Sequence, residues 1–157
     1  GHTDRYGGMY PMQTFSKNRP LDFRQIPVFI EAVDADVEKT LDKLAASVTN
    51  QVYWLSSEDR RYLHLSAVWA CNFVNHCYDI ASQLLQKKQI PYTVLLPLIR
   101  ETAKKIEQLN PKEAQTGPAV RYDENVMAAQ LLLMDNHPEW QEIYRRLSAS
   151  IHKRALE

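Results

Sequence analysis

The sequence has few glycines, and their positions exclude several well-known sites. The four glycines stand at positions 1, 7, 8 and 117, so this chain cannot contain a GxGxxG dinucleotide-binding loop. It also lacks a nucleophile elbow, an HExxH zinc motif, a P-loop and a CxxC pair. No common short catalytic motif therefore identifies a reaction in these 157 residues.

The chain has no excess of charge of either sign and no long hydrophobic run. Nineteen basic residues balance nineteen acidic ones, and without a long basic run there is no sign of a nucleic-acid binder. No apolar run reaches the roughly 18 residues that span a bilayer, and the N-terminus lacks a charged segment followed by an apolar one. We therefore expect a soluble cytoplasmic protein with no nucleic-acid or membrane partner.

Cysteine is scarce as well, because only Cys71 and Cys77 are present. If both lie on one helix, they are separated by about 9 Å along its axis and about 120° around it, too far for a disulfide. We expect free thiols in a reducing compartment, where both cysteines serve as small core residues.

One stretch dominates what is present, because Asp59–Lys88 predicts a single helix of about 30 residues. Ser56 and Ser57 supply N-cap hydroxyls, and Lys87 and Lys88 close the other end. Apolar residues surround most of this predicted helix, a pattern typical of a buried helix. The prediction is therefore a long central helix on which the rest of the chain is organised.

A polar stripe interrupts the apolar surface of this predicted helix. At about 100° per residue, six polar side chains fall near a common line. They are Arg61, Asn72, Asn75, His76, Asp79 and Gln83. Buried polar groups need partners, so the stripe either faces a ligand pocket or cross-links neighbouring helices.

Before the long helix, the pattern predicts a strand–helix–strand unit. Residues 9–15 favour a strand that Pro11 confines to a sheet edge or a strand end. Ile26–Ala32 is a short apolar run of the kind buried in a parallel sheet. Asp34 or Asp36 then caps a helix, and residues 51–56 form a further strand.

After the long helix, the sequence predicts only helices. Pro91 opens a segment that Pro97 should kink and that ends at Asn110 and Pro111. A loop follows, and two further helices begin at the cap residue Asp123 and at Pro138. The predicted fold class is therefore mainly α (α+β), with a small strand–helix–strand head and a helical body.

Two further polar clusters are candidate sites. In the loop of residues 115–123, Thr116, Arg121 and Asp123 stand just before a helix N-terminus, a place suited to an anion. Asp123 could instead be only an N-cap, with Arg121 as its ion-pair partner. In residues 10–16, Tyr10 and Gln13 emerge from a strand end, where ligands often gather, but such a cluster can also be turn chemistry.

Three motifs together resemble a known family. YPMQTFS near the start, RRYLHLSAVWACNFVNH in the long helix and TGPAVRYDEN in the late loop resemble the C-terminal domain of Rossmann-like NADP oxidoreductases, a domain of unknown function. The resemblance runs from about Tyr6 to His152. It extends distantly to the helical domains of pyrroline-5-carboxylate reductase, 6-phosphogluconate dehydrogenase and the deazaflavin-dependent NADP oxidoreductases.

The resemblance implies that different parts of a longer protein bind the substrate and the cofactor. Residues 1–57 would end a Rossmann-like α/β portion, and residues 58–157 would form a helical substrate-binding and dimerisation domain. NADP would be bound mainly by an N-terminal portion that this chain lacks, so the chain alone should be inactive. A small-molecule substrate and a homodimer are implied. The alternative is a non-catalytic helical interaction domain.

The resemblance also implies site residues, motif by motif. His76 would be the catalytic acid or base. The substrate-binding residues would be Tyr10, Gln13, Asn72, Asn75, Thr116, Arg121 and Asp123, with Arg121 clamping a carboxylate or phosphate. Two positions depart from the family pattern, because Tyr10 stands where we expect histidine and Tyr122 where we expect glycine.

Overall fold

The computed structural model describes residues 4–157 and divides into two compact units. The first unit ends at Val74 and the second runs from Asn75 to Glu157, and each is described separately below. Residues 1–3, which open the predicted segment 1–57, lie outside the described residues. The predicted functional division between residues 57 and 58 is a different boundary and stays a prediction.

The first unit contains a three-stranded mixed sheet in the order β1-β2-β3. Strand β1 is Gly7–Pro11, β2 is Val28–Ala32 and β3 is Val52–Trp54. The central β2 pairs antiparallel with β1 and parallel with β3, so the predicted parallel environment of β2 is found on one side only. Pro11 ends an edge strand, as predicted, because a proline has no N–H for a ladder hydrogen bond.

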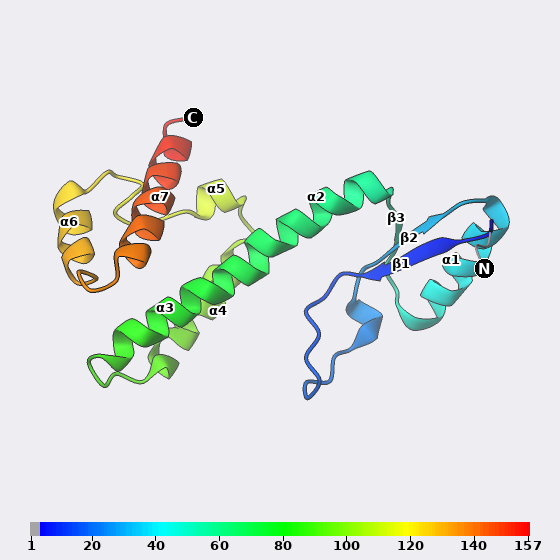
Figure 1. Ribbon diagram of the computed structural model, residues 1–157, viewed down its shortest axis with the longest axis horizontal. Coiled ribbons are helices and arrows are strands. Elements are labelled where there is room, and N and C mark those ends of the chain that lie inside the picture. Colours follow the sequence, from blue (N-terminus) through cyan, green and yellow to red (C-terminus); the bar gives the residue numbers. More distant parts are fainter. Residues whose placement is uncertain (1–3) are drawn as a thin grey trace. The chain divides into compact units, whose positions relative to one another are not determined.

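One helix covers a face of this sheet and closes the core of the first unit (Figure 1). Helix α1, Ala35–Val48, packs on β2 so that Val28, Ile30 and Ala45 are fully buried. A short 3₁₀ turn, η1, Phe23–Gln25, leads into β2. Gly7 is required on β1, because an added Cβ would lie 2.5 Å from Leu41 Cδ1.

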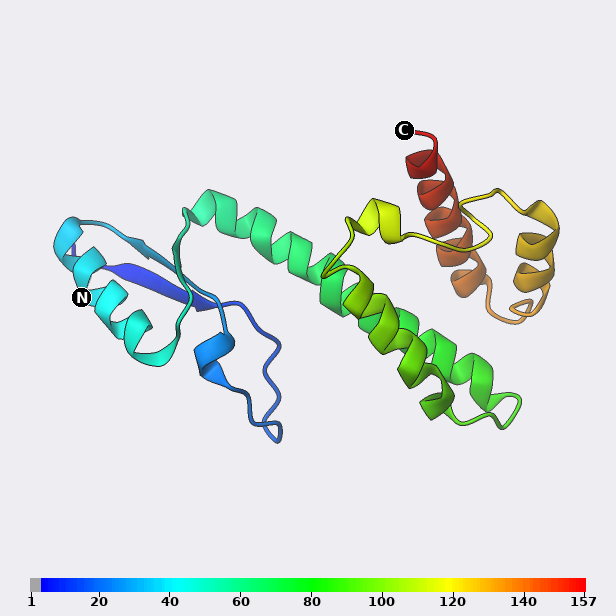
Figure 2. The same cartoon turned by 180° about the vertical axis from the view of Figure 1, so that it is seen from behind.

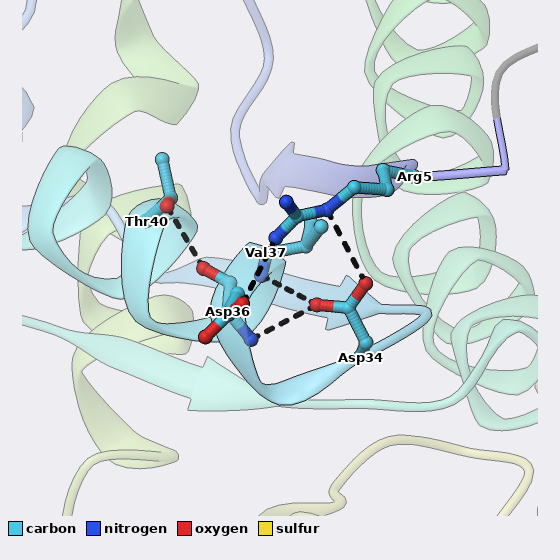
Figure 3. A network of polar contacts seen from close by, with 5 residues as sticks. All are labelled: Arg5, Asp34, Asp36, Val37 and Thr40. Atoms are coloured by element: carbon cyan, nitrogen blue, oxygen red, sulfur yellow. Dashed lines mark hydrogen bonds and ion pairs between the residues drawn. The ribbon is translucent and has the colours of Figure 1, made fainter.

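The start of α1 is fixed by a cluster of polar contacts (Figure 3). Asp34 is the N-cap, since its carboxylate accepts hydrogen bonds of 2.9 Å from the backbone N–H groups of Asp36 and Val37. Arg5 forms ion pairs with Asp34 at 3.6 Å and with Asp36 at 3.2 Å. The hydrogen bond from Val37 is the main cause that lowers the pKa of Asp34. Of the two predicted caps, Asp34 is therefore the one used.

The predicted long helix is present as three consecutive segments. Helix α2, Ser57–Ala67, continues through a π-helical segment, η2, Val68–Phe73, into α3, Val74–Gln86. Ser56 caps it by accepting a 3.1 Å hydrogen bond from the backbone of Asp59. The π-helical segment was not predicted, because nothing in the residue pattern distinguishes it from α-helix.

The far end of the long helix closes with a Schellman motif. The N–H of Ile90 donates to the Leu85 carbonyl at 3.1 Å, and that of Gln89 donates to the Gln86 carbonyl at 3.0 Å. Gln89 adopts φ = 55°, the left-handed conformation that this motif requires. The motif places the helix end at Lys88, as the sequence predicts.

The interpretation of the long helix as buried is wrong for this chain. No residue of α2, η2 or α3 is buried. Cys71 and Cys77 are free, as predicted, but both are exposed and are not core residues. Apolar periodicity shows which side chains favour burial, but the elements of residues 4–157 leave every residue of α2, η2 and α3 at least partly exposed.

The second unit is helical after α3, as predicted (Figures 1 and 2). It contains a 3₁₀ turn, η3, Tyr92–Leu95, and then α4, Leu96–Lys105, α5, Pro111–Ala114, α6, Glu124–Leu132, and α7, Pro138–Ala155. Pro97 does not kink a helix, because it lies in the first turn of α4, where its missing N–H costs nothing. Asn110 caps α5 and so begins a short helix after α4 has ended.

Two side-chain contacts hold the last two helices together. The Tyr144 hydroxyl donates to Gln130 Oε1, and the Gln141 amide donates to the Leu131 carbonyl at 2.8 Å. The two views agree that α6 lies beside α7 and α4 beside α3. Trp140, on α7, is 8% exposed and anchors the small core of this unit.

Candidate functional site

A hollow of about 350 Å³ lies in the first unit, between the segment that follows β1 and one face of the long helix. Its lining combines hydrogen-bonding side chains with a few apolar ones. The lining residues are Tyr10, Met12, Gln13, Thr14, Phe15, His64, Ala67, Cys71 and Asn72. The first motif of the family resemblance and part of the second therefore meet at one place.

The segment after β1 is held in position by local contacts. The backbone N–H of Met12 donates to the Pro27 carbonyl at 2.8 Å, which extends the pairing beyond Pro11 by one residue. Gln13 Oε1 then accepts from the Thr14 backbone at 2.8 Å and forms a local turn. The Phe15 ring stacks on Phe23 with centroids 6.3 Å apart. These contacts place the polar side chains of the segment at the hollow.

The helix face opposite this segment carries regularly spaced residues. His64, Ala67 and Cys71 follow the i, i+3, i+7 spacing that places side chains on one face. Asn72 lies within the π-helical segment, and such segments are frequent at functional sites. The same segment alters the angle turned per residue, so the predicted polar stripe, which assumed uniform α-helix, is not one straight line.

A polar network attaches the start of α2 to the sheet. Glu31, on β2, accepts hydrogen bonds from the backbone N–H of Ser57 at 2.8 Å and from its hydroxyl, and it pairs with Arg60 at 3.3 Å. The hydrogen bond from the Ser57 hydroxyl is the main cause that lowers the pKa of Glu31. Because β2 also pairs with β1, this network fixes the helix face relative to Tyr10.

Two side chains of the hollow contact each other directly across the fold. The Tyr10 hydroxyl and His64 Nδ1 are 3.2 Å apart, a hydrogen bond between residues 54 positions apart in sequence. Sequence reasoning missed His64. Its helical spacing to Ala67 and Cys71 was visible, but only the fold brings it to Tyr10.

The lining of the hollow contains no aspartate, glutamate, lysine or arginine. Its hydrogen-bonding groups are two amides, two hydroxyls, an imidazole and a thiol. Such a set suits an uncharged polar group with an apolar part, since an ion would find no opposite charge there. Among residues 4–157, no cluster of three or more histidine, cysteine or acidic side chains could hold a metal ion.

The structure brings three of the predicted site residues together. Tyr10, Gln13 and Asn72 all line the hollow of the first unit. The other predicted residues belong to the second unit, namely Asn75, His76, Thr116, Arg121 and Asp123. Their assignment to a substrate site stays a prediction.

Within the second unit, the late loop has a clear local role. Asp123 is the N-cap of α6, since its carboxylate accepts a 3.2 Å hydrogen bond from the backbone N–H of Val126. Arg121 is exposed. Tyr122 adopts φ = 51°, in the left-handed region that favours glycine, and its ring lies 4.5 Å from that of His152. The expected family glycine therefore coincides with a position of positive φ.

The polar residues of α3 are exposed, as Asn75, His76, Asp79 and Gln83 all lie on open surface. Gln83 donates to Asp79 at 2.9 Å within the same helix. Exposed polar groups can form hydrogen bonds with water, so these four residues do not need a ligand or a neighbouring helix as partner.

Taken together, the fold defines a mainly helical α+β protein in which an open, uncharged hollow lies between the end of β1 and the α2–η2 part of the long helix. A family model for a domain of unknown function, DUF2520, matches residues 26–151, and the chain belongs to this family. The predicted fold class and the predicted kinship to the C-terminal domain of Rossmann-like NADP oxidoreductases are both confirmed.

Solved structures similar to the chain include one from Bacteroides fragilis and one from Thermotoga maritima. One is described as the "putative NADP oxidoreductase BF3122" from Bacteroides fragilis; it is 51% identical with a TM-score of 0.94, over 98% of this chain and 59% of that one. The other, protein TM1727 from Thermotoga maritima, is 19% identical with a TM-score of 0.75, over 95% of this chain and 61% of that one, and shows the fold alone.

This chain therefore spans about three fifths of the length of either solved relative. No curated protein matches it. Among the described residues, no helix is both long and apolar enough to cross a membrane.

Proposed function

We propose that this chain supplies the substrate-binding part of an NADP-dependent oxidoreductase, and that another portion of the protein binds the dinucleotide. The relative that is 51% identical is described as a "putative NADP oxidoreductase", and this chain corresponds to 59% of it. Reduced NADP would supply hydride for the reduction of a small carbonyl compound or imine.

The residues of this chain fit the substrate end of such a reaction better than the dinucleotide. A dinucleotide diphosphate is usually bound where a glycine-rich turn opens a helix, and the four glycines of the chain form no such turn. The uncharged hollow fits a carbonyl group instead. This pairing of an uncharged hollow with Tyr10, Gln13 and Asn72 is the observation that carries the proposal.

Within this proposal the predicted residues have distinct roles. Gln13 and Asn72 orient polar groups of the substrate through their amides. The other predicted residues lie in the second unit. There, Arg121 is proposed to clamp a carboxylate or phosphate and His76 to act as acid or base, with Thr116 and Asn75 as further polar contacts. Asp123 has the weakest case as a binding residue, because its carboxylate already caps α6.

A homodimer is the second part of the proposal, and it is supported by an exposed apolar stripe on the long helix. Tyr62, Leu65, Trp69 and Phe73 are 69%, 54%, 57% and 47% exposed. Their spacing keeps them on one helix face, and the rings of Trp69 and Phe73 contact edge to face at 4.8 Å. Large exposed apolar patches usually mark protein interaction sites.

The oligomeric state tests this part directly. If the stripe joins two copies, Trp69→Asp makes the protein monomeric in sedimentation equilibrium. Leu132, which is 73% exposed on α6, represents the alternative interface on the last helices. A monomer produced by Leu132→Asp and not by Trp69→Asp would move the interface there, and a monomeric wild type would refute the homodimer.

The two exposed free cysteines fit a reducing compartment, and we propose a cytoplasmic location. Oxidation of either thiol would be expected on exposure to air but not in cells.

The competing function is a non-catalytic helical interaction domain, which the same apolar stripe would favour. Replacing Asn72 and Arg121 by alanine in the full-length protein distinguishes a substrate-binding function from an interaction domain. A substrate site predicts an unchanged melting temperature with lost binding of the carbonyl compound that drives NADPH oxidation. A lowered melting temperature with unchanged binding would favour the interaction domain.

Cofactor binding provides an independent check on the division of labour. NADPH should bind the full-length protein and show no tight binding to this chain alone in a fluorescence titration. Tight binding of NADPH by residues 1–157 would contradict the proposal.

A further inference from the structure

We propose that Tyr10 and His64 form a proton-donating pair in the hollow, in which the Tyr10 hydroxyl touches the substrate oxygen or nitrogen and His64 returns the proton to Tyr10. The inference rests on the proposed function, because it assigns the proton that reduction of a carbonyl or imine requires. It assigns that proton to Tyr10 in place of His76, which belongs to the second unit. It gives a role to His64, which lies within the second family motif but is not among the predicted site residues.

The geometry of the pair suits proton transfer. The Tyr10 hydroxyl lies 3.2 Å from His64 Nδ1, and both side chains line the hollow. Tyr10 is partly buried, whereas His64 is exposed. Tyr10 is thus the more enclosed residue of the two, and the exposed imidazole can exchange protons with solvent.

The chemistry balances without a further reactant. Reduced nicotinamide held by the rest of the protein would supply hydride to the carbonyl carbon, and negative charge would then develop on the substrate oxygen. The O–H bond of Tyr10 breaks as a new O–H bond forms on the substrate. The phenolate then takes the proton from Nδ1 of a protonated His64, and the neutral imidazole is protonated again by water. For an imine, the nitrogen receives the proton in the same way.

Other groups in the hollow are poorer candidates. No carboxylic acid, lysine or arginine lines it, and the hydroxyl of Thr14 and the thiol of Cys71 have no titratable partner there among the described residues. Tyr10 and His64 are the one hydrogen-bonded pair of titratable side chains in the lining that the structure describes.

The fold also holds the pair in place from both sides. Tyr10 lies on β1 opposite Phe29 of β2. His64 lies two turns along the helix from Ser57, and Ser57 is hydrogen-bonded to Glu31 of β2. Both residues are therefore on elements attached to the same central strand, β2, and this attachment limits how far they can separate.

The presence of the pair is tested by nuclear magnetic resonance on the full-length protein, without any substrate. The ¹⁵N shift of His64 Nδ1 should change clearly in Tyr10→Phe, because the hydrogen bond is lost. Tyr6→Phe is the matched control, since Tyr6 is 65% exposed and outside the hollow. An Nδ1 shift that is the same in wild type and Tyr10→Phe would overturn the pair.

Its role is tested by NADPH oxidation with a panel of small aldehydes, ketones and cyclic imines. General acid catalysis typically contributes about 10²–10⁴-fold, so Tyr10→Phe should lower kcat by about 10²-fold or more with KM nearly unchanged. His64→Gln should lower kcat less, and added imidazole should restore part of it, which a merely structural residue would not show.

Each outcome is decisive for one of the two proposals. Wild-type rates in Tyr10→Phe or His64→Gln would overturn the pair, as would loss of turnover in His76→Gln alone. If the wild type oxidises NADPH with no member of the panel, the proposed function fails for these substrate classes. In that case the proton-donating role falls with it, whereas the Nδ1 shift still reports whether the hydrogen bond exists.

Discussion

The two compact units differ in how firmly their side chains are enclosed. In the first unit, Val28, Ile30 and Ala45 have no exposed surface and form one cluster between the sheet and α1. The second unit buries single residues such as Met134 and Trp140, while Leu132 at the end of α6 and Leu133 just after it are more than 70% exposed. The first unit thus provides the rigid frame that a site with fixed geometry requires.

The candidate site lies in the first unit, which has the larger buried cluster. The hollow is lined by a strand end and a helix that are both attached to β2, one by the sheet and the other by Glu31. A site supported in this way keeps its hydrogen-bonding groups in place before a ligand arrives.

The largest effect is expected from truncation of the first core. Ile30→Ala removes a fully buried side chain and should lower the free energy of unfolding by about 2–5 kcal/mol. Leu132→Ala, at a 73% exposed position of the second unit, should change it by less than about 0.5 kcal/mol. Urea denaturation of both variants measures the contrast, and equal losses would contradict it.

A smaller loss of stability is expected from a substitution on β1, where Gly7 packs closely against its neighbours. Gly7→Ala adds a Cβ 2.5 Å from Leu41 Cδ1 and 2.7 Å from the Glu31 carbonyl, and should cost about 1–3 kcal/mol of unfolding free energy. The neighbouring Gly8→Ala is the control, because its Cβ would meet only Arg60 Nη1 at 3.5 Å. Thermal unfolding that ranks the two variants in the opposite order would refute this packing.

These contrasts also show what could be predicted from the sequence. The caps at Ser56, Asp34 and Asp123 and the first-turn proline Pro138 were predicted correctly, because capping depends on a few neighbouring residues. The family and its fold class followed from three motifs. Local chemistry was therefore sufficient for the order of elements.

What could not be predicted depends on contacts between distant segments. The Tyr10–His64 hydrogen bond joins residues 54 positions apart. Whether Cys71 is buried depends on which distant segments cover the helix, and in this chain it is exposed. The π-helical segment has no residue signature. Of the candidate site, sequence motifs supplied Tyr10, Gln13 and Asn72, whereas their juxtaposition with His64 required the fold.

The attachment of the long helix to β2 should depend on pH. The Ser57 hydroxyl lowers the pKa of Glu31 below its usual value of 4.5 in the folded protein. The resulting stabilisation is present above that usual value and is lost as the pH falls through the folded pKa. Glu31→Gln should therefore lower the melting temperature at pH 7, and the difference from wild type should shrink towards pH 3. A difference that stays constant with pH would contradict the carboxylate's role.

The smallest change in the free energy of unfolding is expected from a substitution at the end of the long helix, in the second unit. Gln89→Gly should raise the free energy of unfolding by about 0.5–1 kcal/mol, because Gln89 has φ = 55° and glycine adopts this conformation without strain. Gln86→Gly, one turn earlier in the helix, should instead lower it by about 1 kcal/mol. Opposite signs in urea denaturation would confirm the Schellman motif, and two losses would refute it.

Two methionines report directly on whether substrate binds in the hollow of the first unit. Met12 lines the hollow, whereas Met134 is buried in the second unit. We expect the ¹³C-methyl resonance of Met12 in the full-length protein to shift on addition of the carbonyl compound that drives NADPH oxidation fastest, while that of Met134 stays unchanged. A shift of Met134 with no change at Met12 would contradict the account.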